Sequence, residues 1–339
     1  MESHLYQELT GSQLDAAVRS ALGTSVLQAK LLTGGLFNTT YLVDTADCGR
    51  VVLRVGPINT HLLLPFERTL MEAECHVYTL LQERQIPASE VLALDVSRKV
   101  IDRDFMIVRY IPSKAMSEIK LDEADRERIC RDIGRATAQM HQITDSAFGR
   151  AADVKNGRGF SKWSDCLLHE LAQWESVARP VGLLDGESAD IPGGQSDEGG
   201  CADIYDYICK LVQKAAPALD EITVPHLVHT DFWTGNILIS EQSDRPEFAA
   251  IIDADKAIWG DPELEFANIG WARREPAFWE GYGKNPAKTE AAQTRRSVYR
   301  MIWNLLDYYI FTAELTAPED AEEIKKAALE EMKQLAKMV

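Results

Sequence analysis

The sequence predicts an α+β protein of two lobes, a β-rich N-terminal lobe followed by a mainly helical C-terminal lobe. Short apolar segments separated by turns occupy residues 26–111, and segments with helical periodicity occupy most of residues 117–338. A chain of 339 residues also suits two lobes better than one domain. We expect the N-terminal lobe to span residues 1–111 and the C-terminal lobe to span residues 112–339.

The N-terminal lobe is expected to begin with a short helix and three antiparallel strands. The helix covers residues 11–23 with Ser12 as its cap, and the strands cover residues 26–32, 39–43 and 51–55. The turn between the first two strands contains Gly34 and Gly35. Glycine is common in hairpin turns, so this turn indicates a ligand site only together with other features.

A cation and a helical carboxylate follow these strands. Arg54 lies in the third strand, where it is either a surface charge or a ligand for phosphate groups. Residues 65–84 are expected to form a helix, in which Glu74 is the expected partner of Arg54 and Glu72 is the alternative. Strands at 91–96 and 105–111 then lead into an extended hinge at residues 110–113, whose backbone could bind an adenine edge.

Helical periodicity dominates the C-terminal lobe. We expect helices near residues 117–143, 160–177, 201–215, 291–315 and 319–338, and the aromatic positions of residues 160–177 indicate a buried core face. Residues 182–200 are rich in glycine and acidic residues. They are expected to form a surface loop, either a linker or a lid over a substrate.

The composition limits the class of partner. The formal net charge is -17 and the sequence pI is about 4.9. A negative surface repels nucleic acid and anionic membranes, whereas it suits a cationic small molecule or a simple solvated face. The six cysteines lack metal-binding spacing, and no segment has the pattern of a signal peptide or membrane span. We therefore expect a cytoplasmic monomer or homodimer without nucleic-acid or membrane partners.

The chemistry of the chain is concentrated in one motif, His229-x-Asp231-x-x-x-x-Asn236. An apolar strand at 237–239, a polar turn and a second apolar strand follow it, and the second strand ends at Asp253. This layout is typical of a kinase catalytic loop and its metal-binding strand. Asp231 would accept the proton of a substrate hydroxyl, and Asn236 and Asp253 would hold Mg²⁺. Each residue alone could cap a turn, but their common order and spacing favour a site.

Two neighbouring residues have other expected roles. His229 is expected to brace the loop through hydrogen bonds rather than to act in catalysis. Asp255 is either a second carboxylate of the metal site or an acid that faces the substrate.

These residues resemble the aminoglycoside phosphotransferase and choline-kinase-like family of small-molecule kinases. The resemblance rests on the His229 to Asn236 motif, Ile252-Asp253, Gly260-Asp261-Pro262 and the turn Gly34-Gly35-x-x-Asn38. It implies a protein-kinase-like fold, ATP with GTP as the alternative, Mg²⁺, and transfer of the γ-phosphate to a hydroxyl. It also implies that Asp231 is the base, that Asn236 and Asp253 bind the metal, and that the nucleotide is held by Gly35, Asn38, Thr39, Arg54, Glu74 and the backbone of Arg109 and Ile111.

The sequence departs from the family pattern at two positions. Thr230 stands where the family usually has glycine, which puts the geometry of the catalytic loop in question. Arg54 stands where protein kinases have lysine, a change that some relatives share.

The substrate is less defined than the reaction. The run from Ile252 to Pro262 is similar to phosphotransferases that inactivate antibiotics of the viomycin and capreomycin type, and aminoglycoside and fructosamine kinases share parts of it. An antibiotic-resistance kinase that acts on a cationic molecule is therefore the first expectation. Its expected acidic contacts are Asp255, Asp203 and Asp206, with further candidates at Glu280, Asp307 and Glu314.

The alternatives are a metabolic kinase for a fructosamine, amino sugar or choline-like amine, and a nucleotide-binding regulator with little catalysis. The intact Asp231, Asn236 and Asp253 set argues against the regulator.

Overall fold

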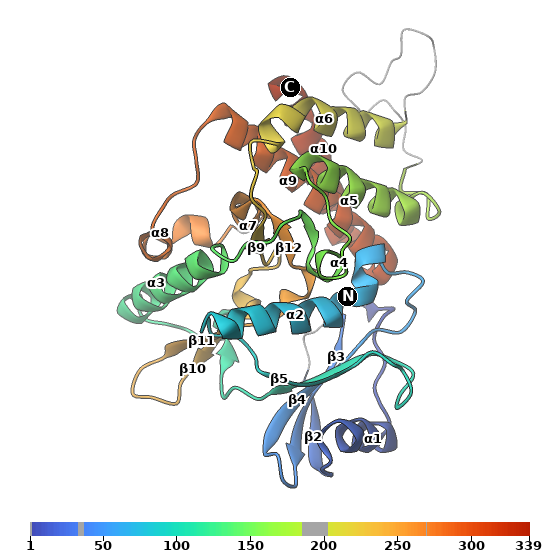
Figure 1. Cartoon of the computed structure of the whole chain (residues 1–339), viewed down its shortest axis with the longest axis vertical. Helices are drawn as coiled ribbons and strands as arrows, with labels where there is room; N and C mark the ends of the chain where they lie inside the picture. The colour runs from blue at the N-terminus through green and yellow to red at the C-terminus, as the bar shows by residue number, and fades with distance from the viewer. Residues whose placement is uncertain (1, 33–36, 185–202, 269) are drawn as a thin grey trace.

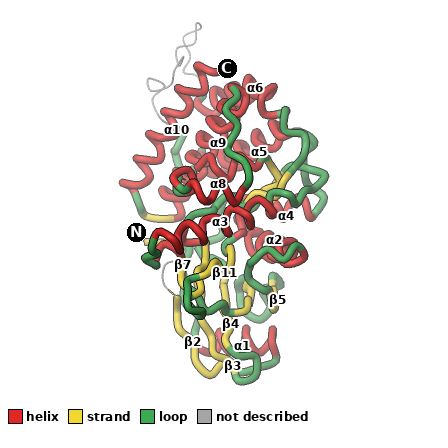
Figure 2. The backbone as a smooth tube through the Cα atoms, turned by 90° about the vertical axis from the view of Figure 1, so that its left-hand side faces the viewer, coloured by secondary structure: helices red, strands yellow, loops and turns green. Residues whose placement is uncertain are grey.

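The computed structural model describes residues 2–32, 37–184, 203–268 and 270–339 (Figure 1). Gly34, Gly35 and most of the predicted loop at 182–200 lie outside the described residues. The two-lobe α+β fold predicted from the sequence is confirmed, with the sheet at one end of the molecule and the long helices at the other (Figures 1 and 2). Among the described helices, none has the length and apolar character needed to cross a membrane.

A five-stranded antiparallel sheet forms the N-terminal lobe, in the order β2-β3-β4-β6-β5. Its strands are β2 (Val26–Leu32), β3 (Thr39–Thr45), β4 (Arg50–Val55), β5 (Val91–Asp95) and β6 (Phe105–Arg109). Alternate side chains of a strand point to opposite faces. Phe105 and Ile107 accordingly pack in a core with helix α1 (Gly11–Leu22), while Met106 and Val108 pack in a core with α2 (Leu70–Glu83). Arg54 of β4 is out of phase with the buried Leu53 and Val55, so it faces α2.

The cap of α1 differs from the prediction. Thr10, and not Ser12, is the N-cap: its hydroxyl accepts from the backbone N–H of Gln13, and the Gln13 side chain accepts from the N–H of Thr10. A threonine followed three positions later by glutamine satisfies two free N–H groups of the helix start, which Ser12 inside the helix cannot do.

The C-terminal lobe contains long helices around two small sheets. The long helices are α3 (Glu123–Met140), α5 (Trp163–Ala178), α6 (Ile204–Leu219), α9 (Glu290–Tyr309) and α10 (Pro318–Met338), and the short ones are α4 (Ala151–Lys155), α7 (Glu265–Asn268) and α8 (Pro276–Tyr282). The sheets have the orders β11-β10-β7 and β8-β12-β9. Their strands are β7 (Lys114–Ala115), β8 (Gly149–Arg150), β9 (His226–Val228), β10 (Ile237–Ser240), β11 (Glu247–Ile251) and β12 (Ile258–Gly260). The helix predicted at 291–315 ends as α9 at Tyr309 and continues as a π-helical turn, Ile310–Glu314.

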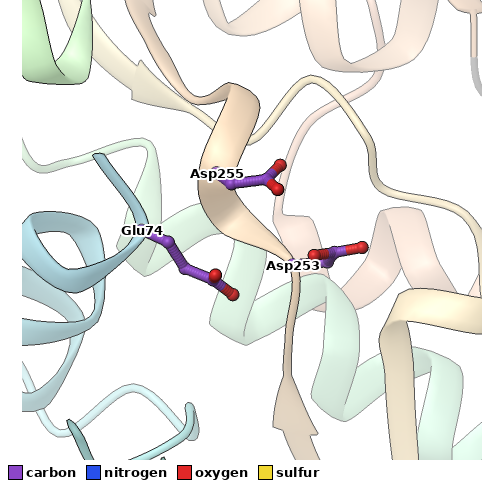
Figure 3. Close-up of side chains that lie close together, drawn as sticks. All are labelled: Glu74, Asp253 and Asp255. Carbon is purple, nitrogen blue, oxygen red and sulfur yellow. The ribbon is translucent and has the colours of Figure 1, made fainter. Parts of the chain in front are cut away.

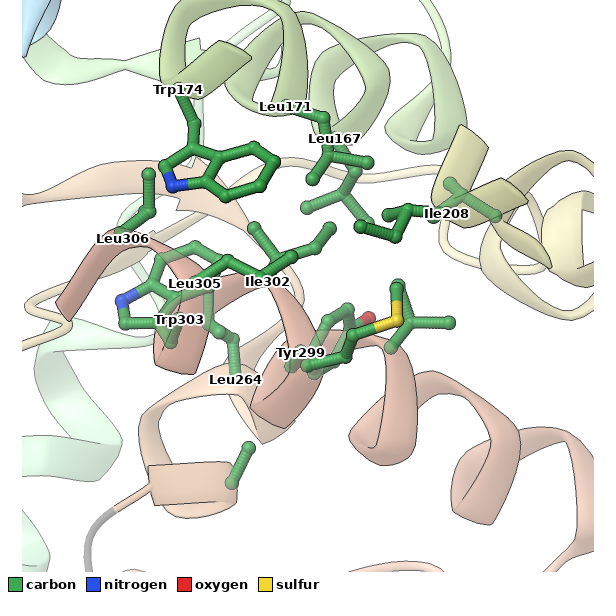
Figure 4. Close-up of a cluster of buried hydrophobic side chains, with 14 of the residues drawn as sticks. Leu167, Leu171, Trp174, Ile208, Leu264, Tyr299, Ile302, Trp303, Leu305 and Leu306 are labelled. Carbon is green, nitrogen blue, oxygen red and sulfur yellow. The ribbon is translucent and has the colours of Figure 1, made fainter. Parts of the chain in front are cut away.

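The core of this lobe lies between α5, α6 and α9 (Figure 4). Trp163, Leu167, Leu171 and Trp174 recur at helical spacing on α5 and are buried, as the sequence predicts for a core face. Full burial of one such side chain contributes roughly 1.5–3 kcal/mol. This core therefore fixes α5, α6 and α9 relative to one another.

The hairpin β10–β11 positions the motif residues. Ile237 pairs with Ile251 in an antiparallel register, and the N–H of Ile252 donates to the carbonyl oxygen of Asn236 at 2.9 Å. The end of β11, which carries Asp253, therefore lies beside Asn236.

Segments that precede the predicted lobe boundary also bind the C-terminal lobe. Strand β1 (Glu2–Ser3) pairs with β13 (Leu315–Thr316), and Leu64 and Phe66 belong to the core of the helical lobe. The Tyr309 hydroxyl donates to the Leu62 carbonyl at 2.6 Å. The two lobes are thus joined by a broad seam, and the boundary at residue 111 stays a prediction.

Two buried glutamates face each other in this seam. Glu67 lies in the 3-10 turn Pro65–Thr69, where its Oε2 accepts from the N–H of Leu64 at 2.9 Å, and Glu314 ends the π-helical turn. The carboxyl oxygens of Glu314 have no donor among the described residues. Burial and the nearby Glu67 raise the pKa of Glu314 to about 10. The physical reason is that a proton on one of the two carboxyls removes a buried negative charge and supplies the missing hydrogen bond.

Replacement of Glu314 by glutamine should stabilise the protein near neutral pH. Because the folded-state pKa of Glu314 is raised, folding of the native chain loses stability as the pH rises from the ordinary glutamate range toward about 10. Glutamine supplies a permanent N–H donor, so Glu314→Gln should raise the melting temperature at pH 8 and flatten its dependence on pH. A melting curve series from pH 5 to pH 9 tests this. Equal slopes in both proteins would contradict the buried pair.

Close contact between α3 and α8 generates a second stability prediction. A Cβ atom at Gly134 would lie 2.1 Å from the carbonyl oxygen of Phe278, so the two helices can approach only at glycine. Gly134→Ala should lower the free energy of unfolding by about 1–3 kcal/mol, although helix propensity alone favours alanine by about 1 kcal/mol. Gly11→Ala is the matched control, because a Cβ there meets no atom within 4 Å. Denaturant unfolding of both variants measures the difference, and equal stabilities would disprove the steric account.

Candidate active site

The loop from His229 to Asn236, which we predicted to be the catalytic loop, brings Asp231 and Asn236 into contact. The Asn236 Nδ2 donates to the carbonyl oxygen of Asp231 at 2.8 Å and to its carboxylate Oδ2 at 3.1 Å. Asn236 is buried, and its amide nitrogen is used inside the loop. Its Oδ1 is therefore the atom that is left for a metal ion.

His229 braces this loop. Its Nδ1 accepts from the N–H of Asp231 at 3.3 Å, and its Nε2 lies 2.9 Å from the carbonyl oxygen of Ile252. Only a neutral ring with its proton on Nε2 satisfies both contacts. The imidazole is fully buried, and its two contacts link the loop of Asp231 to Ile252, the residue before Asp253.

Glu265 of α7 holds the same loop from the other side. Its two carboxylate oxygens accept from the backbone N–H groups of His229 at 2.8 Å and of Thr230 at 3.1 Å. The sequence contained no signal for this contact, because it joins residues more than thirty positions apart.

Thr230 has a left-handed backbone with φ of 68°. Glycine adopts this conformation without strain, whereas a β-branched residue pays roughly 1–2 kcal/mol. The Thr230 hydroxyl donates to the carbonyl oxygen of Lys256 at 2.9 Å, a hydrogen bond that glycine cannot make. Thr230 therefore adopts the left-handed conformation that suits glycine and adds a hydrogen bond to the Lys256 carbonyl.

Arg54 lies at the centre of a buried carboxylate cluster. Its guanidinium forms ion pairs with Glu74 and Asp253 and lies 3.9 Å from Asp255. Figure 3 shows Glu74 reaching from α2 toward the turn that carries Asp253 and Asp255. Tyr78, which we did not assign to the site from sequence, donates its hydroxyl to Glu74 at 2.5 Å and accepts from the N–H of Asp253 at 2.9 Å.

The charges of this cluster are unequal, since three carboxylates share one guanidinium. Burial raises the pKa of Glu74, and burial together with Asp253 and Glu74 raises the pKa of Asp255 well above its usual range. Burial also acts to raise the pKa of Asp253, but the Arg54 guanidinium outweighs it and holds this pKa below the usual value. The raised pKa values mean that the ionised forms of Glu74 and Asp255 are disfavoured here, and a further cation would favour these ionised forms.

The cluster fits a divalent metal ion. One oxygen each of Glu74, Asp253 and Asp255 lies within 4.8 Å of the others, and the Glu74 Oε2 is buried without a hydrogen-bond partner. Hard oxygen atoms are the ligands that Mg²⁺ prefers. Asp253, Asp255 and the Oδ1 of Asn236 are the groups that could hold it.

A cavity of about 450 Å³ opens beside Asp231. Its aromatic walls are Phe66, Trp233, Trp271 and Trp303. Its charged lining residues are Arg150, Asp231, Lys256, Arg274 and Asp307. Burial raises the pKa of Asp231, an effect that Lys256 opposes, and burial raises the pKa of Asp307 to about 6. The cavity has the volume of a small-molecule site, and the Asp231 carboxylate in its lining could face a bound hydroxyl.

The other described residues that we predicted to bind the nucleotide do not line the cavity beside Asp231. Asn38 is buried at a second cavity of about 40 Å³, and the Thr39 hydroxyl donates to the Gln7 carbonyl at 3.0 Å. The Arg109 side chain pairs with Glu90, while the Ile111 carbonyl accepts from Ser113 at 2.9 Å. Gly35 lies outside the described residues.

The predicted acidic substrate contacts are not all at the cavity. Asp203 caps α6 through the N–H of Tyr205 and pairs with Arg179, and Asp206 is exposed on the same helix. Neither lines the cavity beside Asp231, whereas Asp307 does. Glu280 pairs with Arg131, and Glu314 is buried in the seam between the lobes.

Nothing in the sequence indicated a functional role for Lys256 or for the tryptophans of the cavity, because helical or loop tryptophans are usually core residues.

Comparisons with known proteins agree with this geometry. A family model described as the phosphotransferase enzyme family matches residues 28–295. Curated protein sequences give no match.

Solved structures share the fold at low sequence identity. The ternary complex of streptomycin, ATP and APH(2")-IIa has a TM-score of 0.60 at 15% identity and covers 96% of this chain and 99% of its own. A Thermobifida fusca protein assigned as a fructosamine-3-kinase has a TM-score of 0.60 at 15% identity, with 96% and 98% covered. A mutant of aminoglycoside phosphotransferase APH(4)-Ia with ADP and hygromycin B has a TM-score of 0.57 at 18% identity, with 96% and 98% covered. At these identities the likeness shows the fold alone, but the family model covers most of the sequence, and the chain therefore belongs to the phosphotransferase enzyme family.

Proposed function

We propose that this phosphotransferase uses ATP and Mg²⁺ to phosphorylate a hydroxyl of a cationic small molecule. The observation that carries the proposal is the position of Asp231, which lines the cavity and accepts a hydrogen bond from Asn236. The acceptor hydroxyl would donate its proton to the Asp231 carboxylate as its oxygen bonds the γ-phosphorus and the bond to the bridging oxygen breaks.

The other residues position the nucleotide. Arg54, held by Glu74, would contact phosphate oxygens, and Asn236 and Asp253 would hold Mg²⁺, which neutralises phosphate charge when bound. Asp255 would serve as a further carboxylate of the metal site. The backbone of Arg109 and Ile111 would hold the adenine, and Gly35, Asn38 and Thr39 would form the turn over the phosphates.

The choice of nucleotide is supported by relatives. The APH(2")-IIa complex holds ATP, which supports ATP here, and an APH(2")-IIIa complex holds GDP, so GTP is the alternative.

The first candidate acceptors are antibiotics of the aminoglycoside or viomycin and capreomycin type, whose phosphorylation would confer resistance. Asp307 supports a positively charged acceptor, since it lines the cavity and is not needed for proton transfer. The second candidate is a metabolic kinase for a fructosamine, amino sugar or choline-like amine, which the Thermobifida fusca likeness supports.

Asp231→Ala should lower kcat by at least about a hundredfold, because the acceptor hydroxyl loses its proton acceptor. Stabilisation by ATP and Mg²⁺ in a thermal shift should persist. Asp206→Ala is the matched control, since it removes an exposed aspartate away from the cavity and should leave kcat unchanged. Near-normal turnover of Asp231→Ala would exclude Asp231 as the base. A native protein without a shift by ATP and Mg²⁺ would exclude the kinase function itself.

Acceptor binding should weaken in acid. Protonation of Asp307 below its pKa of about 6 removes its attraction for an amine, so the Kd of an amine-bearing acceptor should rise by up to about tenfold per pH unit below that value. Burial is the main cause of the raised pKa of Asp307, while nearby Lys256 lowers this pKa and Asp231 and Glu67 raise it. Titration calorimetry from pH 5 to pH 8 tests this. Asp307→Asn should give a pH-independent Kd over this range, and a slope retained in that variant would assign the effect to another group.

A further inference from the structure

Four aromatic side chains line the cavity beside Asp231. Phe66, Trp233, Trp271 and Trp303 line it together with Leu306 and Ile310. An acceptor that is polar on all sides would gain little from such walls, because aromatic faces favour flat or apolar surfaces.

Trp233 is held open to solvent by the catalytic loop. All seven tryptophans lie in described segments, and Trp233, two positions after Asp231, is the exposed one at 52%. A Cβ atom at Gly235 would lie 2.1 Å from the Trp233 ring, so this ring packs directly against the loop backbone at Gly235. Because this exposed ring also lines the cavity beside Asp231, its surface is available to a ligand in that cavity.

Trp271 is fixed on the same loop. Its Nε1 donates to the Phe232 carbonyl at 2.8 Å, and its ring centroid lies 5.5 Å from that of Phe278. Both tryptophans are therefore positioned by the residues that flank Asp231, so a ligand against them lies within reach of the base.

The charges of the cavity limit the charge of the acceptor. Asp231 receives the hydroxyl proton, which leaves Asp307 as the carboxylate for a ligand amine among the described lining residues. Arg150 is paired with Glu170, and Lys256 lies in the field of Asp231, Glu67 and Asp307. Asp307 is thus one carboxylate for one ligand amine, and the described lining offers no second one for a further positive charge.

We infer that the acceptor carries a flat or apolar ring face, which packs on Trp233 and Trp271, and no more than one positive charge, which Asp307 receives. This inference rests on the proposed function and narrows its substrate class. It favours hydroxylated ring compounds with one amine over polycationic aminoglycosides.

Titration calorimetry with Mg²⁺ and a non-hydrolysable ATP analogue tests this with four probes. Tyramine and erythromycin carry ring surfaces and one amine, ethanolamine carries one amine without a ring, and kanamycin is a polycation. Tyramine should bind at least about tenfold more tightly than ethanolamine, and erythromycin at least about tenfold more tightly than kanamycin. Trp233→Ala should remove about tenfold of affinity for the ring-bearing probes alone, and Trp233→Phe should keep most of it.

Leu27→Ala is the control, because Leu27 is an exposed apolar residue of β2 outside the cavity, and this variant should bind every probe as the native protein does. Tighter binding of kanamycin than of both ring-bearing probes would overturn the inference. An unchanged preference in a folded Trp233→Ala variant, or no binding of either ring-bearing probe at millimolar concentration, would also overturn it. These measurements record binding and not transfer, so loss of the ring preference with ATP-dependent phosphorylation of kanamycin would leave the proposed function intact.

Discussion

The buried guanidinium of Arg54 is the interaction on which the rest of the site depends. It joins the central strand of the N-terminal sheet to α2 through Glu74 and to the C-terminal lobe through Asp253. Removing one partner of such a cluster leaves charges in a medium that solvates them poorly, which typically costs about 3–5 kcal/mol. A lysine could not contact two carboxylates with separate planar N–H groups, so these two ion pairs depend on arginine at this position.

The wider seam between the lobes also combines close packing with buried ionisable groups. Strand pairing of β1 with β13 and the packing of Leu64 and Phe66 hold the segment before α2 against the helical lobe. The Glu67 and Glu314 pair lies in this seam and keeps a proton near neutral pH. The position of α2, and with it Glu74, is therefore determined by contacts with both lobes.

Local patterns in the sequence predicted much of the fold. The alternation of apolar residues identified the strands. The two apolar strands after the His229 to Asn236 motif identified the hairpin β10–β11, because a short hairpin has few ways to fold. The cap of α1 was assigned to Ser12 instead of Thr10, since both residue types favour the same role and only the pairing with Gln13 decides between them. Glu265, Tyr78 and Lys256 were missed because their contacts join distant parts of the chain. The net charge of the chain does not say where each acidic residue lies. It therefore could not predict that Asp307 lines the cavity beside Asp231 while Asp203 and Asp206 lie at the start of α6.

The hydroxyl of Tyr78 has a consequence for motion. It donates to Glu74 within its own helix and accepts from the backbone N–H of Asp253, whose left-handed conformation aims the carboxylate at the cluster. One oxygen atom thus couples the axis of α2 to the direction of the Asp253 side chain. A rotation or outward shift of α2 cannot occur alone: it must either carry the Asp253 turn with it or break this hydrogen bond and release the turn. The position of α2 and the direction of the Asp253 carboxylate are therefore coupled through the Tyr78 hydroxyl.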